Sequence, residues 1–385
     1  MAKPTIALAM IVRNEGHCLA RCLRSVKPHI THWCIVDTGS TDDTKEVIQR
    51  ELGDLPGKLE SRPWGRVSDS WLKRLLGKRD VDFSHNRNES LSLARQFGTD
   101  YLLTLDADEE MFADPGAFDS LTADSYQVRF ELVREGLAGS WPRNFLLKTS
   151  TPWEYQDAIH EHLNRPPGTT IELLGGVHVN SYHDSARNKA GDRVKYDRDI
   201  AVIRRELKKN PEHQRFWFYL GQASAGALRI DDAINAYTKR ASFDDVDNED
   251  NWYSRFQAAA LREYRGDHWQ DVASAYLDAY NARPTRAEPL WALAVLYNDR
   301  KLHAAAELFA RKSCTIARPF ERHLVNDSIY QWRAPWELAN SLAAQGKTGE
   351  ARKILERMLA LDSVPDEAKA DAAANLQKLD ALEAA

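Results

Sequence analysis

The sequence predicts an α/β fold followed by an all-α domain, and two contrasting patterns lead to this prediction. Over roughly the first 190 residues, short apolar runs alternate with segments of helical periodicity, as in a mostly parallel sheet with crossover helices. From Lys195 onward, long amphipathic segments follow one another without a strand pattern. We therefore expect an α/β domain over residues 1–192 and a helical repeat domain over residues 193–385.

Buried strands are expected at the apolar runs Ile6–Val12, Trp33–Asp37 and Tyr101–Leu105. Helical periodicity follows the first two runs, and a further helix is expected just before the third. Polar residues follow each strand directly, namely the Arg13-Asn14-Glu15 turn, Asp37 and Asp106. Because parallel sheets bind ligands beyond the carboxyl ends of their strands, these polar residues are expected around one site.

Two carboxylates end the third strand. Asp106 and Asp108 are spaced i, i+2, so in an extended chain their side chains point to the same side. Two converging carboxylates require a cation between them, and oxygen ligands suit Mg²⁺ or Mn²⁺. This pattern predicts a metal site that handles a diphosphate, while an acidic loop that only ends a strand is the simpler alternative.

The composition is that of an ordinary globular protein. The chain has 385 residues, of which 43% are hydrophobic and 28% charged, and its net charge is −5. This balance does not favour a nucleic-acid or anionic-membrane partner, and the first apolar run is too short to span a membrane. The four cysteines, Cys18, Cys22, Cys34 and Cys314, lack zinc-site spacing and are expected to be structural thiols. We expect a cytoplasmic protein with no membrane segment.

The C-terminal half contains a degenerate helical repeat. Trp217, Leu220 and Gly221, followed by Ala233 and Tyr237, match the tetratricopeptide pattern at the required offsets. Weaker copies follow, and an alanine-rich helix at 365–382 is expected to cap the array. Such arrays bind extended peptides or mediate self-association, so a homo-oligomer formed through the repeats is an open expectation.

Four motifs in the N-terminal half resemble those of a known family. They are Ile11-Val-Arg-Asn-Glu15, Val36-Asp-Thr-Gly-Ser-Thr-Asp42, Asp82-Phe-Ser-His-Asn-Arg-Asn88 and Leu105-Asp-Ala-Asp108. In this order and approximate spacing, they resemble an inverting family-2 glycosyltransferase with the Rossmann-like, nucleotide-sugar-binding GT-A fold. The resemblance covers roughly residues 5–190 and implies a UDP-sugar donor and a divalent metal ion.

The resemblance also implies roles for individual residues. Asp37 would contact the uracil edge, and the family often has a second acid where this chain has Thr38. Arg87 would lie near the base or the diphosphate, and Asp106 near the ribose or the sugar. The other implied nucleotide-sugar contacts are Ile11, Arg13, Asn14 and Glu15.

The metal ligands implied by the resemblance are Asp108 and a late histidine. The position of His183, at the end of a β-like run, matches that histidine. Imidazole is a better ligand for Mn²⁺ than for Mg²⁺, so the pair favours manganese, with magnesium as the alternative.

A catalytic base is expected in the segment Trp153–Glu161. Inverting transfer needs a group that takes the proton of the acceptor as the new bond forms. Glu161 is the first candidate, with Asp157 and Glu154 as alternatives, because no spacing rule separates these acids. Pairing of Glu161 with His160 or Arg165 on a loop is the structural alternative.

Three functions remain open at this stage. The first is metal-dependent transfer of a sugar from a UDP-sugar to a peptide, a protein or another nucleophilic acceptor. The second keeps the enzyme but makes nucleic acid the acceptor, through the basic insertion near residues 62–79 that holds Lys73, Arg74, Lys78 and Arg79. The third is a non-catalytic scaffold with a vestigial sheet domain, which the intact Asp37, Asp106 and Asp108 argue against.

Overall fold

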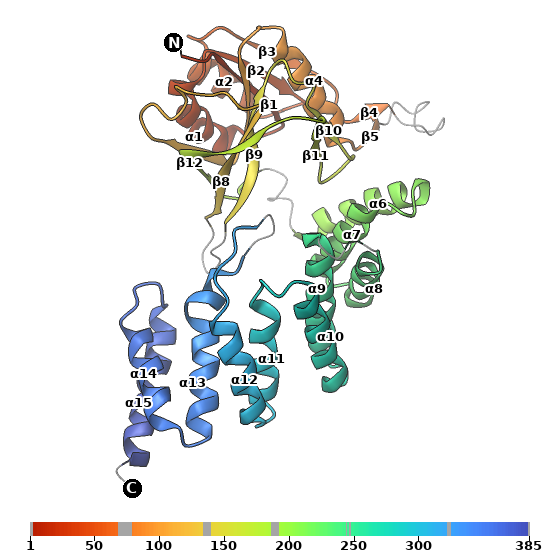
Figure 1. Ribbon diagram of the computed structural model, residues 1–385. Helices are drawn as coiled ribbons and strands as arrows, with labels where there is room; N and C mark the ends of the chain where they lie inside the picture. Colours follow the sequence, from red (N-terminus) through yellow and green to blue (C-terminus); the bar gives the residue numbers. More distant parts are fainter. Residues whose placement is uncertain are drawn as a thin grey trace. The chain divides into compact units, whose positions relative to one another are not determined.

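The structure is a computed structural model that describes residues 3–67, 79–133, 140–185, 192–243, 245, 248–321 and 325–383. It divides into two compact units, Met1–Pro211 and Glu212–Ala385 (Figure 1). The first is an α/β unit and the second is all helical, so the predicted fold class is confirmed. The predicted basic insertion falls largely on residues 68–78, outside the described residues.

The division between the units lies later than the boundary we expected at 192/193. Helix α6 (Asp192–Lys209) clusters with the α/β unit although its sequence resembles the helical half. The guanidinium of Arg205 on this helix lies 3.2 Å from the Asp80 carboxylate and donates to the carbonyl of Val81 at 3.4 Å. A helical pattern marks where strands stop, but these long-range contacts decide which unit the helix joins.

An eight-stranded sheet forms the centre of the first unit. Its strands are β1 (Ile6–Val12), β2 (His32–Asp37), β3 (Gly57–Ser61), β6 (Tyr101–Thr104), β7 (Glu109–Ala113), β8 (Ser125–Leu132), β9 (Ser140–Lys148) and β12 (Ile171–Ser181). Their order in the sheet is β3-β2-β1-β6-β9-β8-β12-β7. Strands β7 and β9 run opposite to the other six, so the carboxyl ends of β1, β2, β6 and β12 share one edge.

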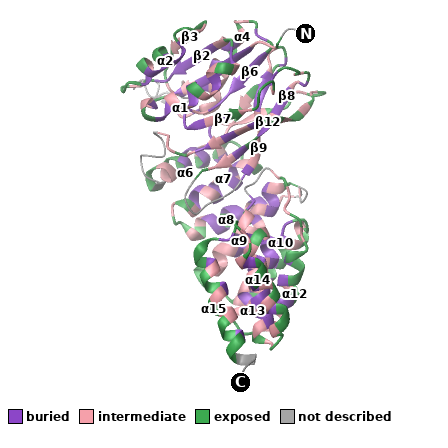
Figure 2. Ribbon diagram, turned by 90° about the vertical axis from the view of Figure 1, so that its left-hand side faces the viewer, coloured by how far each residue is buried: buried purple, intermediate pink, exposed green. Residues whose placement is uncertain are grey.

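Helices cover both faces of this sheet. Alternate residues of β1 point to opposite faces, as expected for a strand buried on both sides. On one face, Leu8 belongs to a core that includes residues of α1 (Gly16–Val26) and α2 (Thr44–Leu52). On the other face, Ala7 and Ala9 pack with α4 (Phe83–Arg95). The central strands are therefore buried along most of their length (Figure 2).

Two short antiparallel pairs of strands complete the first unit near the carboxyl edge of the sheet. They are β4 (Arg66–Val67) with β5 (Arg79–Asp80), and β10 (Glu154–Gln156) with β11 (His162–Asn164). Helix α4 holds the second pair, because the side-chain amide of Asn88 exchanges two hydrogen bonds with the backbone of Tyr155, at 2.7 and 2.9 Å. This attachment positions the segment in which the catalytic base is expected.

The second unit consists of helices in sequential pairs. They are α7 (Gln214–Gly226), α8 (Ile230–Ala241), α9 (Glu249–Arg265), α10 (Trp269–Ala282), α11 (Glu288–Asn298), α12 (His303–Cys314), α13 (Ala334–Ala344) and α14 (Thr348–Leu359). A π-helical turn, η2 (Ile329–Arg333), precedes α13, and α15 (Asp366–Glu383) follows the last pair as the expected cap. The predicted repeat architecture is confirmed.

Close packing of α7 on α8 explains the glycine of the repeat motif. A Cβ added at Gly221 would lie 2.6 Å from the ring of Tyr237, which is buried. A side chain at this position would therefore push the two helices apart. Figure 2 shows the resulting purple interior of the helix pairs and the green outer surfaces.

Two further expectations concern membranes and cysteines. Among the helices in the described ranges, none has both the length and the apolar composition needed to cross a membrane. The four cysteines are free thiols.

Candidate functional site

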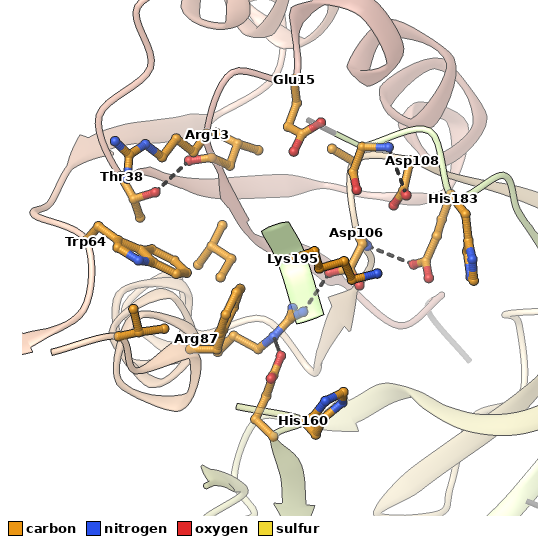
Figure 3. A pocket seen from close by; sticks show the side chains of 18 of the residues that line it. Arg13, Glu15, Thr38, Trp64, Arg87, Asp106, Asp108, His160, His183 and Lys195 are labelled. Atoms are coloured by element: carbon orange, nitrogen blue, oxygen red, sulfur yellow. Dashed lines mark hydrogen bonds and ion pairs between the residues drawn. The ribbon is translucent and has the colours of Figure 1, made fainter. Parts of the chain in front are cut away.

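A cavity of about 780 Å³ opens at the carboxyl edge of the sheet. Most of the site residues predicted from the sequence line it: Ile11, Arg13, Asn14, Glu15, Arg87, Asp106, Asp108, Glu161 and His183. Figure 3 shows Arg13 and Thr38 on one side of the cavity and Asp108 and His183 on the other, with Asp106 between them. The predicted residues are thus brought together, although their roles stay predictions.

The direction of the strands explains this convergence. The Arg13–Glu15 turn follows β1, Asp106 and Asp108 follow β6, and His183 follows β12, all of which end at the same edge. Strand β9 runs the other way, so its first residues also lie there, and Trp141 and Arg143 line the cavity. Residues more than a hundred positions apart meet because the sheet brings the ends of their strands together.

The turn after β1 is fixed by the turn after β2. Asn14 adopts a left-handed backbone conformation, with φ at 58°, and its side chain accepts a hydrogen bond from the Thr41 amide at 2.7 Å. The amide of Glu15 donates to the Thr44 hydroxyl at 2.8 Å. Gly16 approaches Asp43 so closely that an added Cβ would lie 1.9 Å from the carboxylate. The first two motifs therefore form one rigid wall of the cavity.

Two predicted residues do not line the cavity. Asp37 is buried, accepts a hydrogen bond from the Ser40 amide at 3.0 Å and lies 3.3 Å from the Lys45 ammonium group. Asp157 lies 3.2 Å from the ring of His162. Glu154, the third candidate base, is exposed on β10. Of the three acids considered as a base, Glu161 is therefore the one that lines the cavity.

Arg87 joins two of the predicted acids. Its Nη2 donates to Asp106 at 2.7 Å, and its Nε donates to Glu161 at 2.5 Å (Figure 3). Burial alone would lower the pKa of the guanidinium, but the two carboxylates outweigh burial and raise that pKa well above its ordinary value. Arg87 therefore stays charged and fixes the positions of Asp106 and Glu161, which lie far apart in the sequence.

A second arginine anchors the same loop. Arg143 forms two parallel hydrogen bonds to Glu109, at 2.7 and 2.6 Å, and its Nη1 lies 3.6 Å from Asp106. Glu109 in turn accepts a hydrogen bond from the Asp106 amide at 2.8 Å. Burial raises the pKa of Glu109 to about 7, against the lowering effect of the Arg143 charge. The loop after β6 is thus held between two cations.

Asp108 and His183 form the end of the cavity that could hold a metal ion. Asp108 is nearly buried and accepts a hydrogen bond from the Ser185 amide at 3.2 Å. Burial raises the pKa of Asp108, and the nearby Asp106 raises it further, while His183 opposes this rise. A bound divalent cation would favour the charged carboxylate at this position. The oxygen and imidazole donors fit Mn²⁺.

Helix α1 holds the segment after β12 that contains His183. Arg21 donates to both carboxylate oxygens of Asp184, at 2.9 and 3.2 Å, and its guanidinium lies 3.8 Å from the centre of the Tyr182 ring. The Tyr182 amide donates to the carbonyl of Asp108 at 3.1 Å. These contacts on both sides of His183 fix its backbone next to Asp108.

A second group of potential ligands lies beside this end. Glu15, His17 and Cys18 bring one ligand atom each within 4.8 Å of one another. Burial raises the pKa of the Cys18 thiol well above its ordinary range, and Glu15 raises it further. The His17 ring nitrogen lies 2.7 Å from the carbonyl of Asp184. These contacts tie the first turn of α1 to the segment after β12 that contains His183.

Backbone strain in the first unit concentrates at this cavity. The described non-glycine residues with positive φ in this unit are Asn14, Asp157, His160 and His183. Asn14, His160 and His183 line the cavity, and Asp157 lies four residues before Glu161. Such conformations cost free energy and are found preferentially at functional sites.

Several residues that line the cavity were not predicted from the sequence. Trp64 and Phe83 contribute aromatic surface and contact each other edge to face, with ring centroids 4.5 Å apart. Lys195, Arg198 and Asp199 come from α6, which we had assigned to the helical repeats. Their spacing of three and four residues on one helix was the available signal, but nothing local indicated what that face contacts.

Comparisons with known proteins agree with the motifs. Residues 8–115 match the model of the family described as glycosyl transferase family 2. A TPR repeat-containing protein of Synechococcus elongatus is 35% identical over 113 residues, which are 29% of this chain and 23% of that protein. The prophage-derived glycosyltransferase SunS of Bacillus subtilis is 30% identical over 105 residues, which are 27% of this chain and 20% of SunS. The matches thus span about a fifth to a quarter of these relatives.

Solved structures resemble both parts of the chain more distantly. The match to a crystal structure of S. aureus TarS 1-349 in complex with UDP-GlcNAc covers 69% of this chain and 93% of that one, at 12% identity and a TM-score of 0.39. A crystal structure of MamA covers 45% of this chain and 86% of its own, at 17% identity and a TM-score of 0.37. Residues 8–115 therefore resemble glycosyl transferase family 2 both in their motifs and in the family match, and the helix pairs after them have the arrangement of a tetratricopeptide-type repeat.

Proposed function

We propose that this protein is a metal-dependent, inverting glycosyltransferase that transfers a sugar from a UDP-sugar to a nucleophilic acceptor. One observation supports this most strongly. The motif residues after β1 and β6 and the histidine after β12 line a single cavity at the carboxyl edge of the sheet. An acidic loop that only ended a strand would not explain why His183, Arg87 and Arg143 surround it. It would also not explain why three cavity residues have positive φ.

The chemistry of the cavity suggests an orientation for the donor. The aromatic rings of Trp64 and Phe83, together with Arg13 and Thr38, suit a nucleobase and its ribose, because a flat ring can stack on an aromatic face. Asp108 and His183, at the opposite side, suit a metal ion that binds the diphosphate. The sugar would then lie between these ends, near Asp106 and Glu161. Asp37 is buried and does not line the cavity, so its contact with the base is proposed from the family resemblance alone.

The metal ion would be held by Asp108 and His183, with Mn²⁺ favoured over Mg²⁺ by the imidazole. When bound, it would neutralise charge on the departing diphosphate. Asp106, held between Arg87 and Arg143, would contribute to the shape and charge of this site without needing to move.

Glu161 would act as the catalytic base. In a single displacement, the acceptor nucleophile bonds to the anomeric carbon, its proton passes to Glu161, and the bond from that carbon to the UDP oxygen breaks. Glu161 binds Arg87 through Oε1. The Arg87 contact would hold the carboxylate in one orientation, which general-base catalysis requires.

The acceptor is proposed to be a peptide or protein, because arrays of helix pairs offer extended surfaces for peptides. The free thiols fit a reducing compartment, so we propose a cytoplasmic location. A nucleic-acid acceptor would depend on residues that lie mainly at 68–78, outside the described part of the chain.

The first test measures metal-linked donor binding. UDP should raise the melting temperature more with Mn²⁺ than with EDTA, because a ligand that binds only the native state stabilises it by mass action. Asp108→Asn should abolish this difference, whereas Asp119→Asn, an exposed acid paired with Lys3 away from the cavity, should keep it. Equal stabilisation by UDP in EDTA would exclude a metal ion from the donor site.

The second test addresses the chemistry. Glu161→Gln should keep Mn²⁺-dependent UDP binding and lower sugar transfer by about two to four orders of magnitude. Near-normal turnover in this variant would assign the base to another residue.

A further inference from the structure

Helix α6 presents one face to the cavity. Lys195, Arg198, Asp199 and Val202 all line it, and their spacing of i, i+3, i+4 and i+7 is that of a single helical face. This helix lies outside the stretch that matches the family model, residues 8–115. The wall it forms is therefore a contribution of this chain beyond the shared motifs.

The helix is firmly attached to the α/β unit. Ile200 and Ile203 are buried, and Arg205 pairs with the buried Asp80 at 3.2 Å. Arg205 lies one turn beyond Val202, at the next position of the same helical face. This attachment fixes the orientation of the helix, so Lys195 and Arg198 keep facing the cavity.

The charges of the cavity are unevenly distributed. Two of its arginines already pair with carboxylates of the protein, Arg87 with Asp106 and Glu161, and Arg143 with Glu109. A nucleoside diphosphate carries more negative charge than one divalent cation neutralises, so additional positive charge near the diphosphate would favour its binding. The basic residues of α6 supply positive charge from the wall that the motifs do not form.

Lys195 has the geometry for this task. It is partly buried, and Figure 3 shows its side chain in the middle of the cavity, beside Asp106 and between Trp64 and His183. A lysine ammonium group is a compact charge with three donors on a flexible stem, which suits the non-bridging oxygens of a phosphate. Arg198, one turn further along, is more exposed and borders the same space.

We propose that Lys195, supported by Arg198, forms an anion subsite on α6 that binds the diphosphate of the donor. This inference rests on the proposed function, because it assigns α6 to the same donor site. It also explains why α6 belongs to the α/β unit: the helix completes the donor site as a structural part of that unit.

The test compares ligands that differ only in their phosphates. Binding of UDP, UMP and uridine in Mn²⁺ is measured by calorimetry for the wild type and for Lys195→Gln. We expect the variant to bind UDP about tenfold to a hundredfold more weakly, as for loss of a charged hydrogen bond, and to bind uridine unchanged. Lys195→Arg should recover part of the UDP affinity, and Arg198→Gln should lose less than Lys195→Gln.

A matched control is available on the same helix. Lys208 is exposed and does not line the cavity, so Lys208→Gln should bind all three ligands like the wild type. Unfolding without ligand should be the same for Lys195→Gln and Lys208→Gln.

The outcomes separate this inference from the function on which it rests. Unchanged UDP binding by Lys195→Gln, or an equal loss for UDP and uridine, overturns the anion subsite and leaves the proposed function standing. If the wild type binds no UDP in Mn²⁺, both are overturned. A loss that grows from uridine through UMP to UDP supports both.

Discussion

Replacement of Arg87 by methionine tests whether the ion pairs at the centre of the site contribute to stability as their geometry implies. Arg87→Met keeps the volume and removes the hydrogen bonds to Asp106 at 2.7 Å and to Glu161 at 2.5 Å. The side chains of Arg87 and Glu161 are 17% and 12% exposed, and that of Asp106 is 35% exposed. The variant therefore leaves the largely buried Glu161 without its cation, while the partly solvated Asp106 keeps only Arg143, at 3.6 Å.

The expected loss follows from this burial. Removing one partner of a buried ion pair costs about 3–5 kcal/mol, and the solvent access of Asp106 places this case at about 3 kcal/mol. For a unit of this size, 1 kcal/mol corresponds to about 2–4 °C, so the melting temperature should fall by about 6–12 °C. Arg95→Met, on the same helix, removes a hydrogen bond of 2.7 Å to the Trp153 carbonyl and should cost about 1 kcal/mol.

Calorimetry of the full chain measures these losses in melting temperature. Hydrogen exchange of the segment around Glu161 then shows whether the loss arises in the first unit. A double-mutant cycle of Arg87→Met with Glu161→Gln should give a coupling energy of about 2 kcal/mol. If Arg87→Met cost no more than Arg95→Met, or if the coupling were below about 0.5 kcal/mol, the ion-pair argument would be refuted.

Two further predictions concern the metal end and the helical unit. Arg21→Met should raise the Mn²⁺ concentration needed for stabilisation by UDP about tenfold, because Arg21 holds Asp184, next to His183. Arg24→Met on the same helix removes a contact to Glu51 instead and should leave this concentration unchanged. Equal Mn²⁺ titrations of the two variants would contradict the prediction. In the helical unit, the hydrogen bond from Lys347 lowers the pKa of Glu307 to about 2, so its stabilising contribution is present above pH 4.5 and is lost as the pH falls from 4.5 towards 2. Glu307→Gln should therefore destabilise the unit by about 1–2 kcal/mol at pH 7, and urea unfolding at falling pH should show the difference narrowing; a constant difference would argue against this pairing.

The central strands and the polar motifs at their carboxyl ends could be predicted because their signals are local. The apolar run of β1 and the polar turn after it are adjacent in the chain, and the parallel arrangement then places Asp106 beside that turn. The helix pairs could be predicted for the same reason, since the small residue Gly221 and the ring of Tyr237 recur at fixed offsets.

The candidate acids near the end of the α/β unit could not be ranked in this way. Glu161 lines the cavity whereas Asp157, four residues earlier, lies near His162, because backbone turns at Asp157 and His160 redirect the chain between them. A left-handed backbone conformation at a non-glycine residue is hard to recognise from the local sequence. It is stabilised by contacts with another element, here the hydrogen bond from the Phe83 amide to the Ala158 carbonyl at 2.8 Å.

Periodicity and short motifs act over a few residues, so they predicted the two fold classes, the polar residues at the strand ends and the resemblance of the N-terminal half to a glycosyltransferase family. Contacts between distant segments place α6 in the α/β unit, Arg87 between Asp106 and Glu161, and Lys195 at the cavity. These features depend on packing and charge pairing between segments far apart in the chain. The sequence of a helix shows which of its faces is buried. Which element covers that face follows only from how the whole unit packs.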